Sequence, residues 1–306
     1  MPYRLLGPLE VCTAERWAAI GAPKWRALLA VLLLSPARMV PVGVLVDELW
    51  PDDPPQGARK LVSGYVSKLR RVIGDPTGQV LRTRPEGYLM TVQPAEVDIG
   101  RFEELAATGR AAMRQGRAGE AVALLTEAAG LWRGAALADV PTGPLVTAER
   151  ARLEEMRLST AELRAEAQLA CGQYTEVIAD LRSLTAQHRL REHLRALLVR
   201  ALYAAGRRGE ALAEYSDVRA VLATELGVAP GAELQGLHHR ILAQDRHDQH
   251  DQGRLLAALE HLSQAMAICR ELAGTDSPAI AASVLTRVAG DVGLEDHVLS
   301  RLRAVQ

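Results

Sequence analysis

Apolar residues recur every third or fourth position between residues 58 and 74, the spacing that one face of an α-helix requires. Residues 80–92 then form two strand-like segments on either side of Pro85-Glu86-Gly87, whose composition is typical of a turn. The pattern predicts an amphipathic helix followed at once by a β-hairpin. The apolar face of the predicted helix consists of Leu61, Val62, Tyr65, Val66, Leu69, Val72 and Ile73.

Shorter apolar segments precede this helix. Residues 3–11 and 17–20 each predict a strand, and the apolar run after Pro23 predicts a helix over 23–34, because Pro is favoured in a first helical turn. Residues 40–42 predict an extended piece and residues 44–50 a short helix. The sequence WPDDPPQ at 50–56 predicts a loop, since each Pro disfavours a helical residue before it. Strands, three helices and a hairpin, in this order, predict a winged helix-turn-helix.

Positive charge is concentrated on the predicted helix and hairpin. Residues 58–84 hold seven basic residues and one acid, Asp75, in a chain whose net charge is −1. Residues 1–95 carry a net +4 and residues 96–306 a net −5. A basic head on an acidic body suggests that the head binds a polyanion such as DNA. The alternative is an ordinary surface helix with a solvated basic face.

The helix and hairpin define a set of candidate DNA-binding residues. Small and polar side chains let a helix approach the major groove, while Lys and Arg neutralise phosphates. We expect the polar stripe to lie in the groove, three further cations to face phosphates, and the hairpin to lie along the backbone or in the minor groove. The stripe is Lys60, Ser63, Gly64, Ser67 and Arg71, the phosphate-facing cations are Arg59, Lys68 and Arg70, and the hairpin residues are Arg82, Thr83 and Arg84.

Beyond a predicted boundary at residues 94–98 the sequence becomes almost entirely helical and repeats itself. A Gly followed four residues later by Glu occurs at Gly116, Gly172 and Gly206, and 34 residues, the tetratricopeptide period, separate the last two. Each Gly predicts a helix end with positive φ, and each Glu predicts the start of the next helix. Residues 130–146 supply an inserted loop. A generic helical bundle with Gly caps is the alternative.

The predicted fold is therefore mainly α, in three parts. Residues 1–95 form a winged-helix DNA-binding domain with short strands, and residues 96–244 an all-α tetratricopeptide-like domain. Residues 245–306 form a helical tail of unknown role, which begins with a polar linker around His247 and His250.

Other kinds of chemistry find little support in the sequence. It contains no Gly-rich phosphate loop, no H-E-x-x-H and no G-x-S-x-G motif, so we expect no enzyme and no cofactor. The three cysteines and the histidines near 250 fit no metal-ligand spacing. The N-terminus lacks a signal peptide, and the apolar run at 28–34 is too short to span a bilayer, so we expect a cytoplasmic protein without a membrane partner.

Eleven segments together resemble the Streptomyces antibiotic regulatory proteins, which join an OmpR-type winged helix to a tetratricopeptide-like bacterial transcriptional activation domain. They extend in family order over about residues 3–243. The segments are LGPLEV (6–11), GAPKWRALLAVLLL (21–34), LVDELW (45–50), DPP (53–55), YVSKLRRVIG (65–74), TRPEGYLM (83–90), RFEEL (101–105), LWRGAALADV (131–140), RLEEMRL (152–158), ALYAAGRRGEALAEY (201–215) and ELGVAPGAEL (225–234).

The resemblance implies a pathway-specific transcriptional activator that binds tandem direct repeats with a second protomer. It also implies that loop 50–56 faces RNA polymerase, its sigma or alpha subunit, through Trp50, Asp52, Asp53 and Gln56. The alternative for this loop is a plain connector whose acids keep DNA away from that edge. Ser63 stands where the family often has Gln, so the target sequence need not be a relative's. The alternative function is a tetratricopeptide-type scaffold whose basic head binds acidic protein partners.

Overall fold

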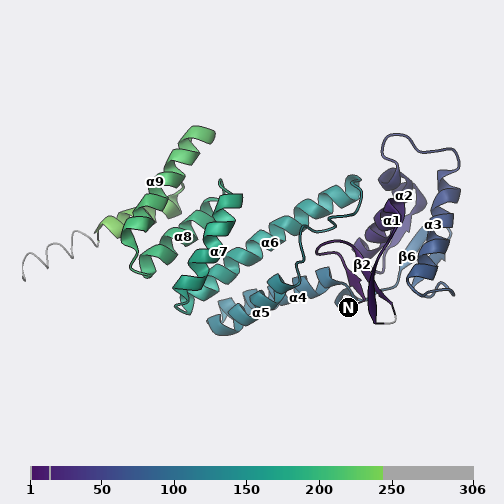
Figure 1. Ribbon diagram of the computed structural model, residues 1–306, viewed down its shortest axis with the longest axis horizontal. Coiled ribbons are helices and arrows are strands. Elements are labelled where there is room, and N and C mark those ends of the chain that lie inside the picture. Colours follow the sequence, from purple (N-terminus) through teal and green to yellow (C-terminus); the bar gives the residue numbers. More distant parts are fainter. Residues whose placement is uncertain (1, 14, 244–306) are drawn as a thin grey trace, which may run out of the picture. The chain divides into compact units, whose positions relative to one another are not determined.

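The computed structural model describes residues 2–13 and 15–243, in which short strands precede a series of helices (Figure 1). Met1–Gly227 form one compact unit and Val228–Gln306 a second. The described part of the second unit is a helix over 232–243 and the residues that lead into it. The linker and tail helices predicted beyond residue 244 lie outside the described residues. The mainly α fold class is confirmed.

The N-terminal strands form an antiparallel sheet in the order β1-β2-β3, with β1 at Tyr3–Arg4, β2 at Glu10–Thr13 and β3 at Arg16–Ala19. The prediction of one continuous strand over 3–11 is wrong. Leu5 and Leu6 are adjacent and both fully buried, whereas a strand would point them to opposite faces. Their N–H groups bond the carboxylate of Asp98 and not a neighbouring strand.

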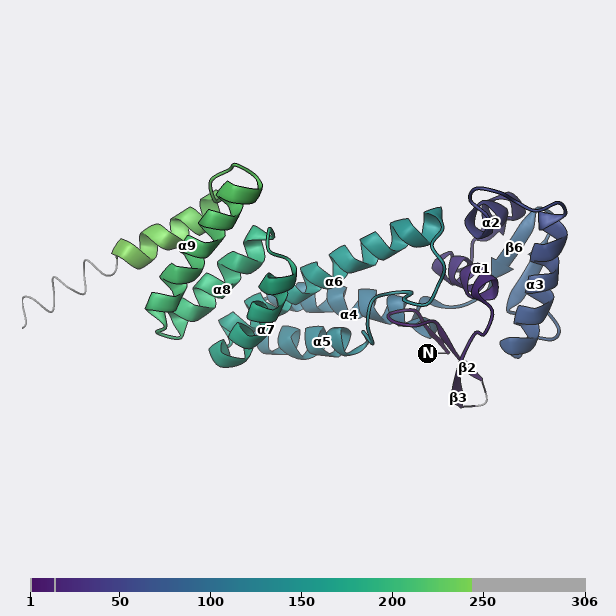
Figure 2. The ribbon, with the colours of Figure 1, turned by 45° about the horizontal axis from the view of Figure 1, so that its top comes forward.

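The predicted winged helix-turn-helix is confirmed. Its helices are α1 at Pro23–Leu34, α2 at Val42–Leu49 and α3 at Ala58–Val72, which pack on one another. A second antiparallel sheet, in the order β4-β6-β5, comprises β4 at Met39–Pro41, β5 at Leu81–Arg84 and β6 at Gly87–Met90 (Figure 2). A Cβ at Gly87 would lie 2.1 Å from the carbonyl oxygen of Val40, so only glycine allows β4 to approach β6 here.

The helical part begins with the 3-10 turn η1 at Pro94–Glu96 and continues as pairs of helices joined by short turns. Gly116, Gly172 and Gly206 end the first helix of each pair with φ of +73°, +75° and +75°, as the sequence predicted. The pairs are α4 at Asp98–Arg114 with α5 at Ala118–Gly130, α6 at Pro144–Ala170 with α7 at Tyr174–Gln187, and α8 at Glu192–Ala204 with α9 at Arg208–Glu225.

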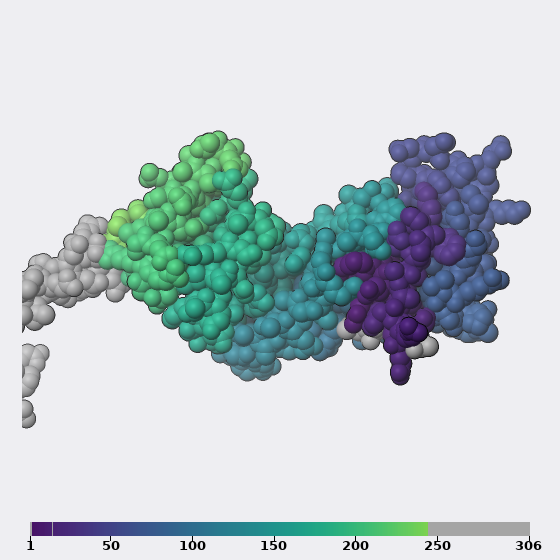
Figure 3. All heavy atoms as spheres, in the orientation of Figure 1, coloured from purple at the N-terminus to yellow at the C-terminus, as the bar shows by residue number. Residues whose placement is uncertain are grey.

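The inserted loop between α5 and α6 packs on the N-terminal sheet. The N–H groups of Arg133 and Leu137 donate to the carbonyls of Leu6 and Leu5, each at 2.8 Å. Apolar residues of the loop join one core that extends from Tyr3 to Leu153. In Figure 3 the purple atoms of the N-terminal residues accordingly adjoin the teal atoms of the helical part. The winged helix and the first helical pairs therefore share a hydrophobic core.

Candidate DNA-binding surface

The orientation of α3 follows from its sequence pattern. Val62, Val66 and Leu69 are buried against α1 and α2, and the polar stripe lies opposite them. Lys60, Ser63, Gly64, Ser67 and Arg71 are all exposed, as are Arg59 and Lys68. The prediction that Leu61 belongs to the buried face is wrong, since it is 40% exposed. It lies about 100° around the helix from Val62, at the edge of the apolar stripe.

Small residues keep the centre of the polar stripe open. A Cβ added at Gly64 would meet no atom within 4 Å, so internal packing does not require glycine there. The Ser67 hydroxyl donates to the carbonyl oxygen of Ser63 at 3.1 Å, which holds it against the helix while its oxygen can still accept. The helix backbone is thus accessible to a close partner along this stripe.

A buried carboxylate positions the hairpin that follows α3. Asp75 is 4% exposed and accepts hydrogen bonds from the N–H groups of Gln79 (2.7 Å), Val80 (3.0 Å) and Leu81 (2.7 Å). Sequence reasoning missed this role and counted Asp75 only as the lone acid of the basic region. An acid followed by Pro and Gly directly after a helix is a turn signal that could have indicated it.

The side chain of Arg70 also connects α3 to the hairpin. Its guanidinium donates to the carbonyl oxygen of Leu81, at 2.9 and 2.7 Å, and to the Thr83 hydroxyl at 2.8 Å. Arg82 is half-buried and donates to the carbonyl oxygen of Gln79 at 2.8 Å, whereas Thr83 and Arg84 are exposed near the tip. The structure therefore brings the predicted cations together on α3 and the hairpin, with Arg70 and Arg82 engaged inside the protein.

Aromatic residues pack against α3 and against the start of loop 50–56. The Trp50 and Tyr65 rings stack with centroids 6.1 Å apart, and the Lys24 ammonium lies 5.0 Å from the Trp50 ring centre. The Lys68 ammonium lies 5.1 Å from the Trp25 ring centre. These distances suit cation–π contacts. Trp50 is half-buried in this cluster, while Asp52, Asp53 and Gln56 are exposed.

Three carboxylates hold the winged helix to the helical part, in what we term the seam: Glu48, Asp98 and Asp139. Glu48 accepts from the N–H groups of Leu145 (2.7 Å) and Val146 (3.0 Å), at the first turn of α6. Asp98 accepts from Leu5 and Leu6, and Asp139 from Leu9 at 2.7 Å. Burial raises the pKa of Asp98, while the backbone hydrogen bonds and Arg133, 3.9 Å away, act in the opposite direction.

The described residues lack two features, a membrane-spanning helix and a metal-binding cluster. Within residues 2–13 and 15–243, no helix has the length and apolar character needed to cross a membrane. The same residues contain no group of three or more His, Cys, Asp or Glu arranged to hold a metal ion.

An exposed polar helix beside a basic hairpin defines the class of protein: a winged-helix DNA-binding transcriptional regulator. Two family models agree with this class. Residues 20–90 match "Transcriptional regulatory protein, C terminal", and residues 97–242 match "Bacterial transcriptional activator domain".

Individual relatives cover most of the chain. The chain is 38% identical over 253 residues to regulatory protein DnrI of Streptomyces peucetius, covering 80% of this chain and 93% of that protein. It is 41% identical over 243 residues to regulatory protein AfsR of Streptomyces griseus, but spans only 24% of AfsR. The solved structure of Mycobacterium tuberculosis EmbR in complex with a low-affinity phosphopeptide superposes with a TM-score of 0.76 at 37% identity, covering 79% of this chain and 65% of that one.

The chain belongs to the Streptomyces antibiotic regulatory protein family, with an OmpR-type DNA-binding domain and a bacterial transcriptional activator domain. The predicted family is therefore confirmed. The relatives are transcriptional regulators and not enzymes, in agreement with the absence of catalytic motifs. The matched segment LWRGAALADV (131–140) forms most of the inserted loop between α5 and α6, which packs on the N-terminal sheet.

Proposed function

We propose that this protein is a sequence-specific transcriptional activator of a secondary-metabolite gene cluster. It binds tandem direct repeats near promoters and recruits RNA polymerase. The observation that supports this function is the exposed polar stripe of α3 beside a basic hairpin, in a chain of this family. Its ligand is double-stranded DNA, and no cofactor takes part.

In the proposed complex the polar stripe of α3 enters the major groove. Lys60, Ser63, Ser67 and Arg71 contact base edges, and Gly64 allows close approach of the helix backbone. Arg59 and Lys68 face phosphates. Arg84 and Thr83 of the hairpin contact the DNA backbone or enter the minor groove. Arg70 and Arg82 belong to the same surface, but their hydrogen bonds to the hairpin suit them to positioning it.

The test is footprinting on the promoters beside its own gene, followed by titrations of the protected site and of random DNA at several salt concentrations. Wild-type protein should prefer the protected site by about 10³-fold or more. Replacing Lys60, Ser63, Ser67 and Arg71 together by Ala should abolish that preference. Binding that falls with salt equally on both DNAs would instead support a basic head that merely attracts acidic partners.

A second proposal concerns the number of copies. Direct repeats place two protomers head to tail, and this arrangement needs two different surfaces and no symmetric dimer. We expect a monomer or weak dimer in free solution and two protomers on a complete site. Analytical ultracentrifugation with and without the footprinted duplex measures both states. A single protomer that saturates the whole site would overturn this arrangement.

Loop 50–56 is the proposed surface for RNA polymerase, through its sigma or alpha subunit. Asp52 and Asp53 are exposed, and within the described chain neither has an ion pair. Prolines on both sides restrict the loop at low entropic cost, and two acids complement a basic partner face. Gln56 is available on the same loop for contact with RNA polymerase. Trp50 stacks on Tyr65, which suits it to hold the loop in position.

Transcription in a purified system tests the loop. The double variant Asp52→Ser, Asp53→Ser should bind the promoter as the wild type does and yield less transcript. The matched control is Asp47→Ser, an exposed acid on the neighbouring α2. Full transcript, or promoter binding that falls in parallel with transcript, would overturn the proposed contact.

A further inference from the structure

A cavity of about 260 Å³ lies within the helical part, lined by residues of α4, α5, α6 and α7 and of the inserted loop. Its apolar lining includes Phe102, Leu125 and Leu184, and two small residues, Ala129 and Ala161, leave room between them. Phe102 and Trp132 meet edge to face, with ring centroids 5.4 Å apart and an interplanar angle of 87°. The lining thus combines an apolar and aromatic floor with several polar side chains, as in sites that bind and orient small molecules.

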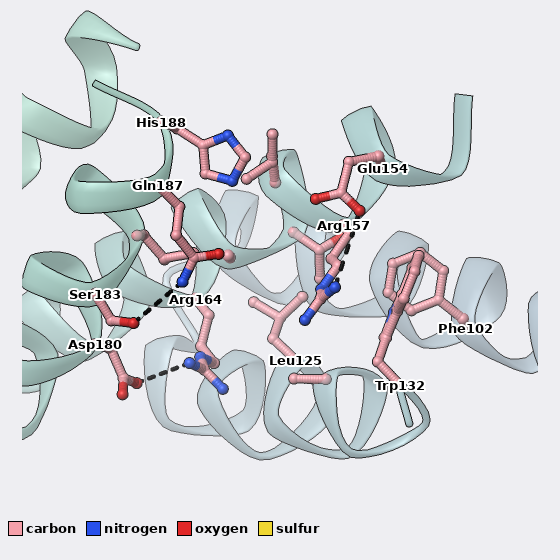
Figure 4. Close-up of a pocket in the computed structure, with 15 residues that line it drawn as sticks. Phe102, Leu125, Trp132, Glu154, Arg157, Arg164, Asp180, Ser183, Gln187 and His188 are labelled. Atoms are coloured by element: carbon pink, nitrogen blue, oxygen red, sulfur yellow. Dashed lines mark hydrogen bonds and ion pairs between the residues drawn. The ribbon is translucent and has the colours of Figure 1, made fainter. Parts of the chain in front are cut away.

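The polar groups at the two ends of the cavity differ. At one end Arg164 and Asp180 form a direct ion pair at 2.7 Å. At the other end the Arg157 guanidinium lies 4.9 Å from the Trp132 ring centre. Its one ion pair in the described chain is with Glu154 at 3.9 Å, too long for a hydrogen bond, and both side chains are more than 40% exposed. Figure 4 shows the guanidinium between Glu154 and Trp132, pointing toward the middle of the lining residues.

Two donor groups at this end have no hydrogen-bonded acceptor within the described part of the chain. The five N–H groups of Arg157 have no acceptor at hydrogen-bond distance among the residues that the structure describes. The indole N–H of Trp132 is buried and likewise has no partner there. A guanidinium on an aromatic ring suits a planar anion, which can accept two parallel hydrogen bonds.

We propose that this cavity binds a small aromatic carboxylate. Its ring lies on the apolar lining between Leu125, Leu184 and the aromatic pair, and its carboxylate accepts from the Arg157 guanidinium. The exposed Glu154 is displaced or screened by water, since a solvent-exposed pair at 3.9 Å contributes little. This site is separate from the DNA-binding surface and independent of the proposed function.

Calorimetric titration of the full chain with 2-naphthoate, and with its neutral analogue 2-naphthylmethanol, tests the site. The expected Kd for 2-naphthoate is about 1 mM or tighter, within the range for a ligand of this size. The alcohol should bind about fivefold more weakly, because it lacks the charge that Arg157 recognises. Arg157→Gln should weaken 2-naphthoate by a similar factor and remove the preference for the anion.

Two further variants locate the site. Ala161→Leu fills the cavity with a larger side chain, which a helix tolerates, and should abolish binding of both compounds. If this variant does not fold, Ala129→Leu is the second cavity-filling variant. The matched control Arg219→Gln removes an exposed cation of α9 and should bind as the wild type does.

Nuclear magnetic resonance gives an independent readout. Of the four indole N–H signals, the one that Trp132→Phe removes should shift when 2-naphthoate is added. No measurable binding at 10-fold above the expected Kd, a shift confined to the other indoles, or binding unaffected by a folded cavity-filling variant would overturn the proposal.

Discussion

The outward face of α3 and the seam use charge in opposite ways. Arg59, Lys60 and Arg71 are exposed, and within the described residues none of their side chains forms an ion pair or hydrogen bond. At the seam, Glu48 and Asp98 are 4% and 2% exposed, and each accepts hydrogen bonds from two backbone N–H groups. The side-chain donors on the outward face of α3 are thus free to bind a partner. The carboxylates of the seam already accept hydrogen bonds within the folded protein.

The difference shows why burial, and not charge, decides what a substitution does. A buried carboxylate that is removed leaves N–H groups unpaired in a low-dielectric interior, so the folded state loses free energy. An exposed cation that is removed leaves only water behind, so the effect is confined to binding. Asp75 is the test case between the two, because it is buried like a seam residue but supports the hairpin that we propose contacts DNA.

The largest effect is expected at the seam. Asp98→Ala should lower the free energy of unfolding by about 3–5 kcal/mol, because Leu5 and Leu6 lose their acceptor. Denaturant unfolding measures the change. The control Asp47→Ala, at an exposed acid of α2, should stay within about 0.5 kcal/mol of wild type. A loss below about 1 kcal/mol for Asp98→Ala would contradict the role given to this carboxylate.

Asp75→Ala should produce an intermediate and mixed result. Three N–H groups at the start of the hairpin lose their acceptor, so we expect a loss of about 2–3 kcal/mol in unfolding free energy. Because the hairpin is then poorly positioned, DNA affinity should also fall, measured at a temperature where the variant is folded. Stability loss with unchanged affinity would mean that the hairpin does not contact DNA.

Arg71→Ala should leave the unfolding free energy within about 0.5 kcal/mol of wild type and act on binding alone. We expect specific DNA binding to weaken by about 1.5 kcal/mol, as for loss of one base contact. Fluorescence anisotropy with the footprinted duplex and with random DNA distinguishes a base contact from a phosphate contact. An equal loss on both duplexes would assign Arg71 to phosphate and not to a base.

The smallest effect distinguishes a functional glycine from a tolerated one. Gly64→Ala should stabilise folding by about 0.5–1 kcal/mol, because the site has space for a methyl group and Ala is the better helix former. DNA affinity should nevertheless fall if the α3 backbone approaches the groove floor at this position. Thermal unfolding and fluorescence anisotropy on the same preparation measure the stability and the DNA affinity. A gain in stability with full affinity would place Gly64 outside the contact with DNA.

Much of the DNA-binding part follows from local sequence. The amphipathic spacing predicted α3, and the observed helix begins at Ala58 as expected. Pro23 predicted the start of α1, and the three repeated glycines predicted the turns of the helical pairs, because only a residue that tolerates positive φ suits those helix ends. These features depend on residues that are close in sequence, so their pattern is sufficient to indicate them.

The tertiary structure decided which charged residues bind within the protein and which remain for a partner. Arg70 and Arg71 are adjacent and chemically identical, yet Arg70 holds Leu81 and Thr83 while Arg71 is exposed. Likewise Asp47 is exposed and Glu48 is buried at the N-terminus of α6, 97 residues away in sequence. Hydrogen bonds between distant segments depend on how the helices and sheets pack, and a one-dimensional pattern of charge contains no record of that packing.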